Sequence, residues 1–225
     1  ATKNDILKFY PGIKEEKTKV IHHGFSADIF GENRDPEKEN NLKKDLGIEG
    51  EYILYSGAIQ PRKNLERLIE AFDAYKNRSK SGIKLVLAGE KAWLWESVEK
   101  KAQESQFSAD IIMPGKLKFC DIGHLFRGAK VFVYPSLYEG FGITVLEAYS
   151  AGIPLICASN SSLAEIGGKG ALYFDANNAN ELSEQIEKVL SSEELQKELI
   201  AKGKERLEDF SWEKCVRETL EFIKL

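Results

Sequence analysis

Cysteine and histidine are scarce in this sequence, and their placement argues against a structural metal site. The 225 residues include three cysteines and three histidines. Cys120, Cys157 and Cys215 are odd in number, lie far apart and form no CxxC pair, and the histidines show no metal-ligand spacing. This pattern indicates a reducing compartment and predicts no structural zinc site.

Long apolar runs and a strong excess of one charge are also missing. No apolar run approaches the ~20 residues that a membrane-spanning helix needs, and no signal peptide is visible. A net charge of −4 argues against a dedicated nucleic-acid surface, and 42% hydrophobic with 30% charged residues is typical of a soluble globular protein. We therefore expect a cytoplasmic protein. Because the chain starts at Ala1 without Met, we also expect it to be a portion of something longer.

From residue 52 onward, short apolar runs alternate with helical patterns. The expected strands are Tyr52–Ser56, Lys84–Ala88, Asp110–Met113, Val131–Tyr134, Pro154–Ala158 and Ala171–Phe174. The helices expected between them are Leu65–Lys76, Leu94–Glu104, Ile122–Ala129, Ile143–Ser150 and Leu163–Ile166. This alternation predicts an α/β fold, a Rossmann-like parallel sheet with helices on both faces.

The two ends of the chain depart from this alternation. Residues 1–50 are charged and irregular, with one strand candidate at Lys19–His22 and a Gly/Asp/Asn/Pro-rich passage, Gly24–Asn41, that predicts a loop. We assign 1–50 to a segment leading into the domain, 51–210 to the domain and 211–225 to a C-terminal helix. Helices are also expected at Asn180–Leu190 and Glu193–Leu207. The apolar stripe of the last helix is expected to pack against a neighbouring domain or the sheet.

The strongest functional pattern lies between Tyr134 and Glu147. A Gly-Phe-Gly turn follows an apolar strand and precedes a helix that begins at Ile143. Such a turn offers a phosphate site, because the first helical N–H groups have no intrahelical partner. Glu139 and Glu147 flank the turn, and ionised carboxylates accept hydrogen bonds from sugar or ribose hydroxyls. Phosphate next to a polyol predicts a nucleotide-sugar.

The loop after the first strand carries a second pattern. Gly57 lets a ligand approach the backbone, and Arg62 and Lys63 stand at a helix start, where the helix dipole disfavours cations. A bound anion explains this pair better than helix stability does. The alternative is that both are solvated surface charges.

Three further segments leave alternatives open. Pro114 and Gly115 are typical of a turn, but their place after the third strand also allows backbone contacts to a nucleobase. Trp93 and Trp95 favour helix-start packing over base stacking. Ser159–Glu165 predicts either hydroxyl groups for a ligand or a capped short helix.

With these motifs, residues 19–225 resemble the C-terminal, donor-binding domain of a GT-B glycosyltransferase of the retaining family 4 (glycosyltransferase group 1). The Glu-x7-Glu element, Glu139–Glu147 within Pro-Ser-x-x-Glu-Gly-Phe-Gly, is the family's most specific mark. Ala151–Ile156, Ser162–Glu165 and Ala171–Phe174 follow in the expected order. Many members have Arg after the strand-one glycine, where this chain has Ala58. Its Pro-Arg-Lys-Asn loop is similar to mannosyltransferase-like and O-antigen-type members.

The resemblance implies a role for each position. Glu139 would contact the donor-sugar hydroxyls, and Glu147 would bind the ribose diol. Lys63, with Arg62, would neutralise the diphosphate, so that these two cations and Glu139 form the catalytic set. The backbone of the turn and helix start would hold the sugar and β-phosphate, at Gly140, Phe141, Gly142 and Ile143. Gly57 and Gly115 complete the expected nucleotide-sugar contacts.

The resemblance also implies a function in polysaccharide biosynthesis. The enzyme would transfer a hexose, first mannose from GDP-mannose with UDP-sugars next, to a glycan or lipid-linked acceptor at the inner membrane face. It would retain anomeric configuration and need no cofactor or divalent metal. The N-terminal acceptor-binding domain would be missing, leaving this donor half inactive alone. The alternative is a non-catalytic or degenerate nucleotide-binding Rossmann-like module. A dinucleotide site is disfavoured because the first loop has no GxGxxG.

Overall fold

A six-stranded, fully parallel sheet forms the centre of the computed structural model, which describes residues 1–31 and 35–224. Its order is β3 (Ile111–Gly115), β2 (Lys84–Ala88), β1 (Tyr52–Ser56), β4 (Val131–Tyr134), β5 (Leu155–Ala158) and β6 (Ala171–Phe174). Every residue of β1 is buried, as expected for a central parallel strand covered on both faces. The strand order reverses between β1 and β4, and ligands bind beyond the strand ends at such a switch point. The predicted α/β class is confirmed.

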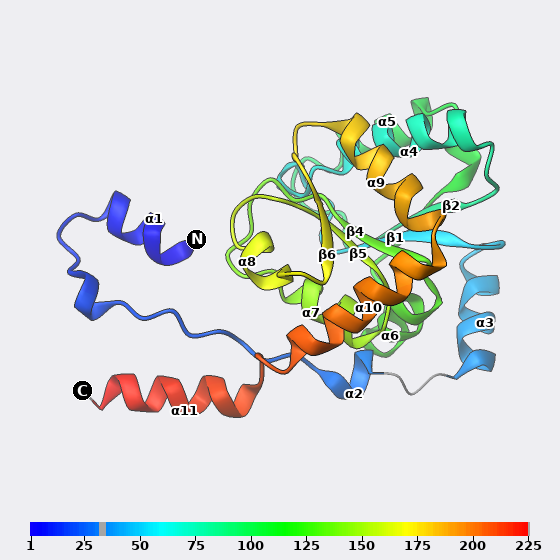
Figure 1. Ribbon diagram of the computed structural model, residues 1–225. Coiled ribbons are helices and arrows are strands. Elements are labelled where there is room, and N and C mark those ends of the chain that lie inside the picture. Colours follow the sequence, from blue (N-terminus) through cyan, green and yellow to red (C-terminus); the bar gives the residue numbers. More distant parts are fainter. Residues whose placement is uncertain (32–34, 225) are drawn as a thin grey trace.

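Helices cover both faces of the sheet (Figure 1). One layer holds α4 (Leu65–Ser79), α5 (Glu96–Glu104) and α9 (Ala179–Leu190). The other holds α2 (Ala27–Phe30), α3 (Pro36–Asp45), α6 (Phe119–Gly128), α7 (Ile143–Ser150) and α10 (Glu193–Leu207). Helix α8 (Leu163–Gly167) follows β5. The 3₁₀ turns are Glu15–Lys17, Pro61–Lys63 and Ser108–Asp110.

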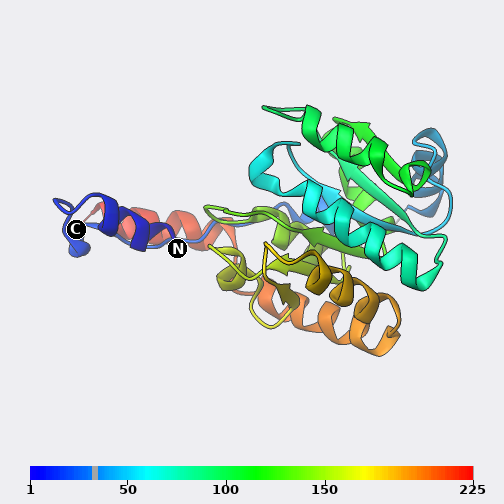
Figure 2. The ribbon, with the colours of Figure 1, turned by 90° about the horizontal axis from the view of Figure 1, so that it is seen from above.

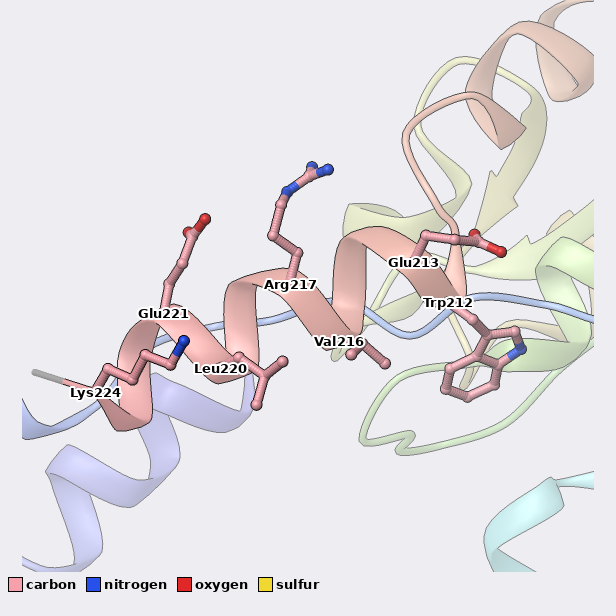
Figure 3. Close-up of a pocket in the computed structure, with 7 residues that line it drawn as sticks. All are labelled: Trp212, Glu213, Val216, Arg217, Leu220, Glu221 and Lys224. Atoms are coloured by element: carbon pink, nitrogen blue, oxygen red, sulfur yellow. The ribbon is translucent and has the colours of Figure 1, made fainter.

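The first and last helices stand outside these layers. Figures 1 and 2 show α1 (Thr2–Phe9) and α11 (Trp212–Ile223) extending from the same side of the domain. Neither helix has a buried residue. Trp212, Val216 and Leu220 lie along one side of α11, and Glu213, Arg217 and Glu221 along the other (Figure 3). The stripe therefore does not pack on the sheet, and the neighbouring-domain alternative stays a prediction.

The sequence predictions fail mainly in the N-terminal segment. Lys19–His22 forms no strand, because no ladder partner faces it among the described residues. The loop prediction for Gly24–Asn41 is wrong over α2 and the start of α3, while its residues 32–34 lie outside the described residues. Helix α3 begins with Pro36, and Asp35 caps it by accepting from the Lys38 N–H at 3.1 Å. Within residues 1–31 and 35–224, no helix combines the length and apolarity needed to cross a bilayer.

Candidate functional site

The β1 loop and the β4 turn meet at the switch point and share one charged cluster. Lys63 Nζ lies 2.5 Å from Glu139 Oε1 and donates to Tyr134 Oη at 2.9 Å. Arg62 Nη1 lies 2.9 Å from Glu139 Oε2 and also donates to the Tyr138 carbonyl. The structure thus brings together the three side chains predicted to act on the sugar and the diphosphate.

Two of the three charged side chains in this cluster are buried, which is unusual for charged groups. Lys63 is 7% exposed and Glu139 8% exposed. Burial lowers the pKa of Lys63, although the hydrogen bond to Glu139 opposes the shift. Burial alone would raise the pKa of Glu139, but the hydrogen bond from Lys63 and the nearby cations hold it below its usual value. A carboxylate already neutralises the predicted anion site, so the bound-anion explanation of Arg62 and Lys63 is incomplete.

Asn64 fixes the β1 loop in place. Its backbone is left-handed (φ 58°), a conformation that Asn tolerates better than most residues. Its side-chain amide donates to the Pro135 carbonyl at 3.0 Å and the Ala176 carbonyl at 2.8 Å, which ties together the loops that follow β1, β4 and β6. Sequence reasoning gave Asn64 no role. Its position in the Pro-Arg-Lys-Asn loop was the available signal.

The segment after β5 holds the Glu139 backbone. Ser161 Oγ accepts from the Glu139 N–H at 3.1 Å, and Ser162 Oγ donates to the Glu139 carbonyl at 2.8 Å. Asn160 donates to the Leu137 carbonyl at 2.8 Å. The two alternatives for this segment were hydroxyl groups for a ligand and a capped short helix. A short helix does form, but the Ser162 side chain makes no capping hydrogen bond to it. Its hydroxyl groups instead position the turn, a role that sequence reasoning missed.

Gly142 starts α7 with φ 94°, a left-handed value suited to glycine. A Cβ there would lie 2.8 Å from Leu163 Cδ2. No side chain caps α7 among the described residues, so the first N–H groups, at Ile143 and Thr144, are available to an anion. Gly140 is exposed, and a Cβ added to it would meet no atom within 4 Å. The Phe141 ring lies 4.9 Å from the His23 ring, so only its backbone remains at the turn.

Glu147 lies one helical turn into α7, behind the free N–H groups. Its carboxyl is partly buried and has no ionic partner among residues 1–31 and 35–224, and burial raises its pKa to about 7. A carboxyl desolvated in this way gains from hydroxyl groups that donate to its charged form. This environment suits the predicted contact with a ribose diol.

A hollow of about 710 Å³ lies on the other side of the switch point. Gly57 and Gly89 border it at the ends of β1 and β2, and Lys116 follows Gly115 at the end of β3. The sheet order thus places Arg62 and Lys63 after β1, next to the α7 amides that follow β4. The hollow lies at the ends of β1, β2 and β3. Of the Trp pair, Trp95 packs against the core, whereas Trp93 is 72% exposed.

Metal ligands do not gather at this site. Over the described ranges, no group of three or more His, Cys, Asp or Glu side chains could hold an ion. The expectation of metal-independent chemistry stays a prediction.

Comparison with known proteins identifies what this architecture is similar to. A family model described as "Glycosyl transferases group 1" matches residues 37–206. The O-antigen chain mannosyltransferase B of Escherichia coli is 34% identical over 187 residues, covering 81% of this chain and 48% of that protein. The chain therefore spans about half the length of this relative.

Solved structures share the fold. A glycosyltransferase from Rickettsia africae has a TM-score of 0.88 at 21% identity, covering 98% of this chain and 60% of its own. The Anabaena protein Alr3699/HepE, in complex with UDP and glucose, has a TM-score of 0.85 at 17% identity, covering 100% of this chain and 61% of its own. At these identities the match shows the fold alone.

Proposed function

The chain belongs to the group 1 glycosyltransferases, and we propose that it forms the donor-binding part of a retaining hexosyltransferase. The observation that carries the proposal is the meeting of Arg62, Lys63 and Glu139 beside the uncapped start of α7, with the partly buried Glu147 one turn further on. Cations, free amides and two carboxylates match the diphosphate, ribose and sugar of one nucleotide-sugar.

The proposed chemistry is stabilisation of the leaving group. When the bond between the sugar C1 and the phosphate oxygen breaks, negative charge grows on the diphosphate. Arg62, Lys63 and the α7 amides would stabilise this charge, the role that a divalent metal fills in other transferases. Glu139 would accept hydrogen bonds from the sugar hydroxyls and orient the sugar. No side chain of this chain is assigned as a nucleophile.

The proposed donor is GDP-mannose, with UDP-sugars next. The identity with an O-antigen chain mannosyltransferase supports mannose, whereas the Anabaena protein of the same fold holds UDP and glucose. The proposed acceptor is a growing glycan or lipid-linked saccharide at the inner membrane face, bound by a domain outside this chain. In this proposal the chain binds the donor but transfers little or no sugar alone.

Calorimetry tests the proposal directly. The chain is titrated with GDP, UDP, ADP and their sugar conjugates, without metal. Charge-assisted bonds contribute about 1.5–3 kcal/mol each against several kcal/mol of association cost, so Kd should lie between about 10 μM and 1 mM. Glu147→Ala should abolish the binding, whereas Glu198→Ala, which removes an exposed carboxylate from α10, should leave it unchanged. Absence of binding at millimolar nucleotide would contradict the proposal.

A further inference from the structure

The hollow beside the switch point has the lining that a flat heterocycle needs. Gly57 N–H donates to the Ala88 carbonyl at 2.9 Å, and Gly89 N–H donates to the Gly115 carbonyl at 2.9 Å, so the strand ends form one continuous floor. A Cβ on Gly89 would lie 1.8 Å from the Gly57 oxygen. Glycine at positions 57 and 89 leaves this part of the floor as bare backbone, which a planar ring can approach closely.

Apolar side chains form one wall of the hollow. Leu117 and Ile122 line it together with Phe119, which is 57% exposed. The buried Phe30 meets the Phe119 ring edge to face at 6.0 Å and 82°, so the core supports the exposed ring on one side. An exposed aromatic ring held beside a bare floor is a stacking surface for a base.

The polar groups on the rim are a carboxylate and an ammonium that form an exposed ion pair. Glu90 Oε2 lies 3.1 Å from Lys116 Nζ, and both residues line the hollow. The Ile59 N–H donates to the Glu90 carbonyl at 2.8 Å, and the Ala92 N–H donates to the Ile59 carbonyl at 3.0 Å. These backbone bonds fasten the Glu90 loop to the β1 loop, so the Glu90 backbone stays at the rim of the hollow.

Guanine complements this pair better than other bases do. Its pairing edge carries the O6 acceptor next to the N1–H and N2–H₂ donors, which match one ammonium next to two carboxylate oxygens. Uracil has one donor between two carbonyls, so its second carbonyl would face the carboxylate. Adenine has one donor group for the carboxylate. We infer that Glu90, with Lys116, recognises guanine and sets the base preference of this site, an inference that rests on the proposed donor function.

Inosine diphosphate provides the sharpest test, because it differs from GDP only in lacking the N2 amino group. Calorimetry of the chain should show GDP binding about tenfold more tightly than inosine diphosphate, a difference of about 1.4 kcal/mol. Glu90→Gln should bring the two affinities within about twofold, because the amide NH₂ opposes the N2 donors. The control Glu51→Gln breaks the 2.8 Å pair with Lys130 at the opposite end of the sheet and should keep the full ratio.

The outcomes separate this inference from the function on which it rests. Equal wild-type affinity for the two nucleotides, an unchanged ratio in Glu90→Gln, or tighter binding of UDP than of GDP would overturn the role of Glu90. In each of these cases, binding that still depends on Glu147 would leave the donor function standing. If wild-type chain binds none of the nucleotides at millimolar concentration, both proposals fail.

Discussion

Binding of a nucleotide-sugar should depend on the ionisation of Glu147. Burial raises the pKa of this carboxyl to about 7, whereas the proposed contact requires a carboxylate that accepts from two ribose hydroxyls. Because the protonated form prevails below pH 7, binding must first remove the proton there. At pH 5.5 only about 3% of the sites are ionised, so affinity should fall about 30-fold, or about 2 kcal/mol, and level off above about pH 8.

The ligand in this measurement should not itself titrate in the pH range in which Glu147 titrates. The terminal phosphate of a free nucleoside diphosphate titrates near pH 6 and would itself change the affinity. In GDP-mannose and UDP-glucose that phosphate is esterified, so Glu147 is the group expected to titrate. Calorimetry between pH 5.5 and 8.5 should show affinity rising about 16-fold from pH 5.5 to pH 7 and about twofold more above pH 7. Glu147→Gln should bind weakly at every pH. A flat wild-type profile, or an equal slope in the Gln variant, would refute the reasoning.

The raised pKa of Glu147 also affects folding stability. A rise in pH should lower the stability of the unliganded chain, whereas it should raise the affinity for the nucleotide-sugar. The pKa of Glu147 is higher in the folded chain, at about 7, than its ordinary value of 4.5. The unfolded chain therefore releases this proton first, and stability that is present below pH 4.5 is lost as pH rises to 7. The loss is at most about 3 kcal/mol. Urea unfolding should find Glu147→Gln more stable than wild type at pH 8, with the difference shrinking toward pH 4.5.

Three further substitutions test the parts of the site separately. Lys63→Met should weaken GDP binding by about 1.5–3 kcal/mol in calorimetry and leave guanosine binding unchanged, since only GDP carries the diphosphate. Equal loss for both ligands would contradict the assignment. Glu139→Gln should keep or strengthen GDP binding, because it frees Lys63 and Arg62 to pair with the diphosphate. The same variant should lower sugar transfer by a full-length enzyme at least about 100-fold. Weaker GDP binding would contradict the idea that the diphosphate replaces Glu139 as the partner of these cations. Gly89→Ala should cost about 3 kcal/mol or more in urea unfolding, because its Cβ would lie 1.8 Å from the Gly57 oxygen, whereas Gly82→Ala meets no atom within 4 Å and should change stability little.

The sequence was sufficient for the sheet because the strand signals are local. Bounds for β1, β2, β4 and β6 match the prediction, and β5 begins one residue later, at Leu155 rather than Pro154. Each strand is a short apolar run between turn residues, and a parallel sheet buries such runs on both faces. Strand β3 is shifted to Ile111–Gly115, the least regular of the six, where its pairing with β2 changes register.

The failures have long-range causes. Helix α3 has a weak apolar pattern, and it is held by Glu39, which is 5% exposed and pairs with Arg127 of α6 at 3.2 Å. No local pattern predicts a partner 88 residues away. The supporting roles of Ser161 and Ser162 were missed for the same reason, since their hydroxyls contact a backbone more than 20 residues distant. Position along the chain predicted that Arg62, Lys63 and Glu139 lie at one site, but not that they neutralise one another.

This neutralisation bears on how the site works before a ligand arrives. A buried ion pair such as Lys63–Glu139 loses hydration that its attraction offsets only in part, so stability alone is a weak reason for it. The buried ion pair is better explained if a diphosphate replaces Glu139 as the partner of Lys63 and Arg62 when the donor binds. Glu139 then gains free acceptor oxygens beside the cations, where the donor sugar would lie. The unliganded site would thus hold its cations in position with the same carboxylate that later accepts the sugar hydroxyls.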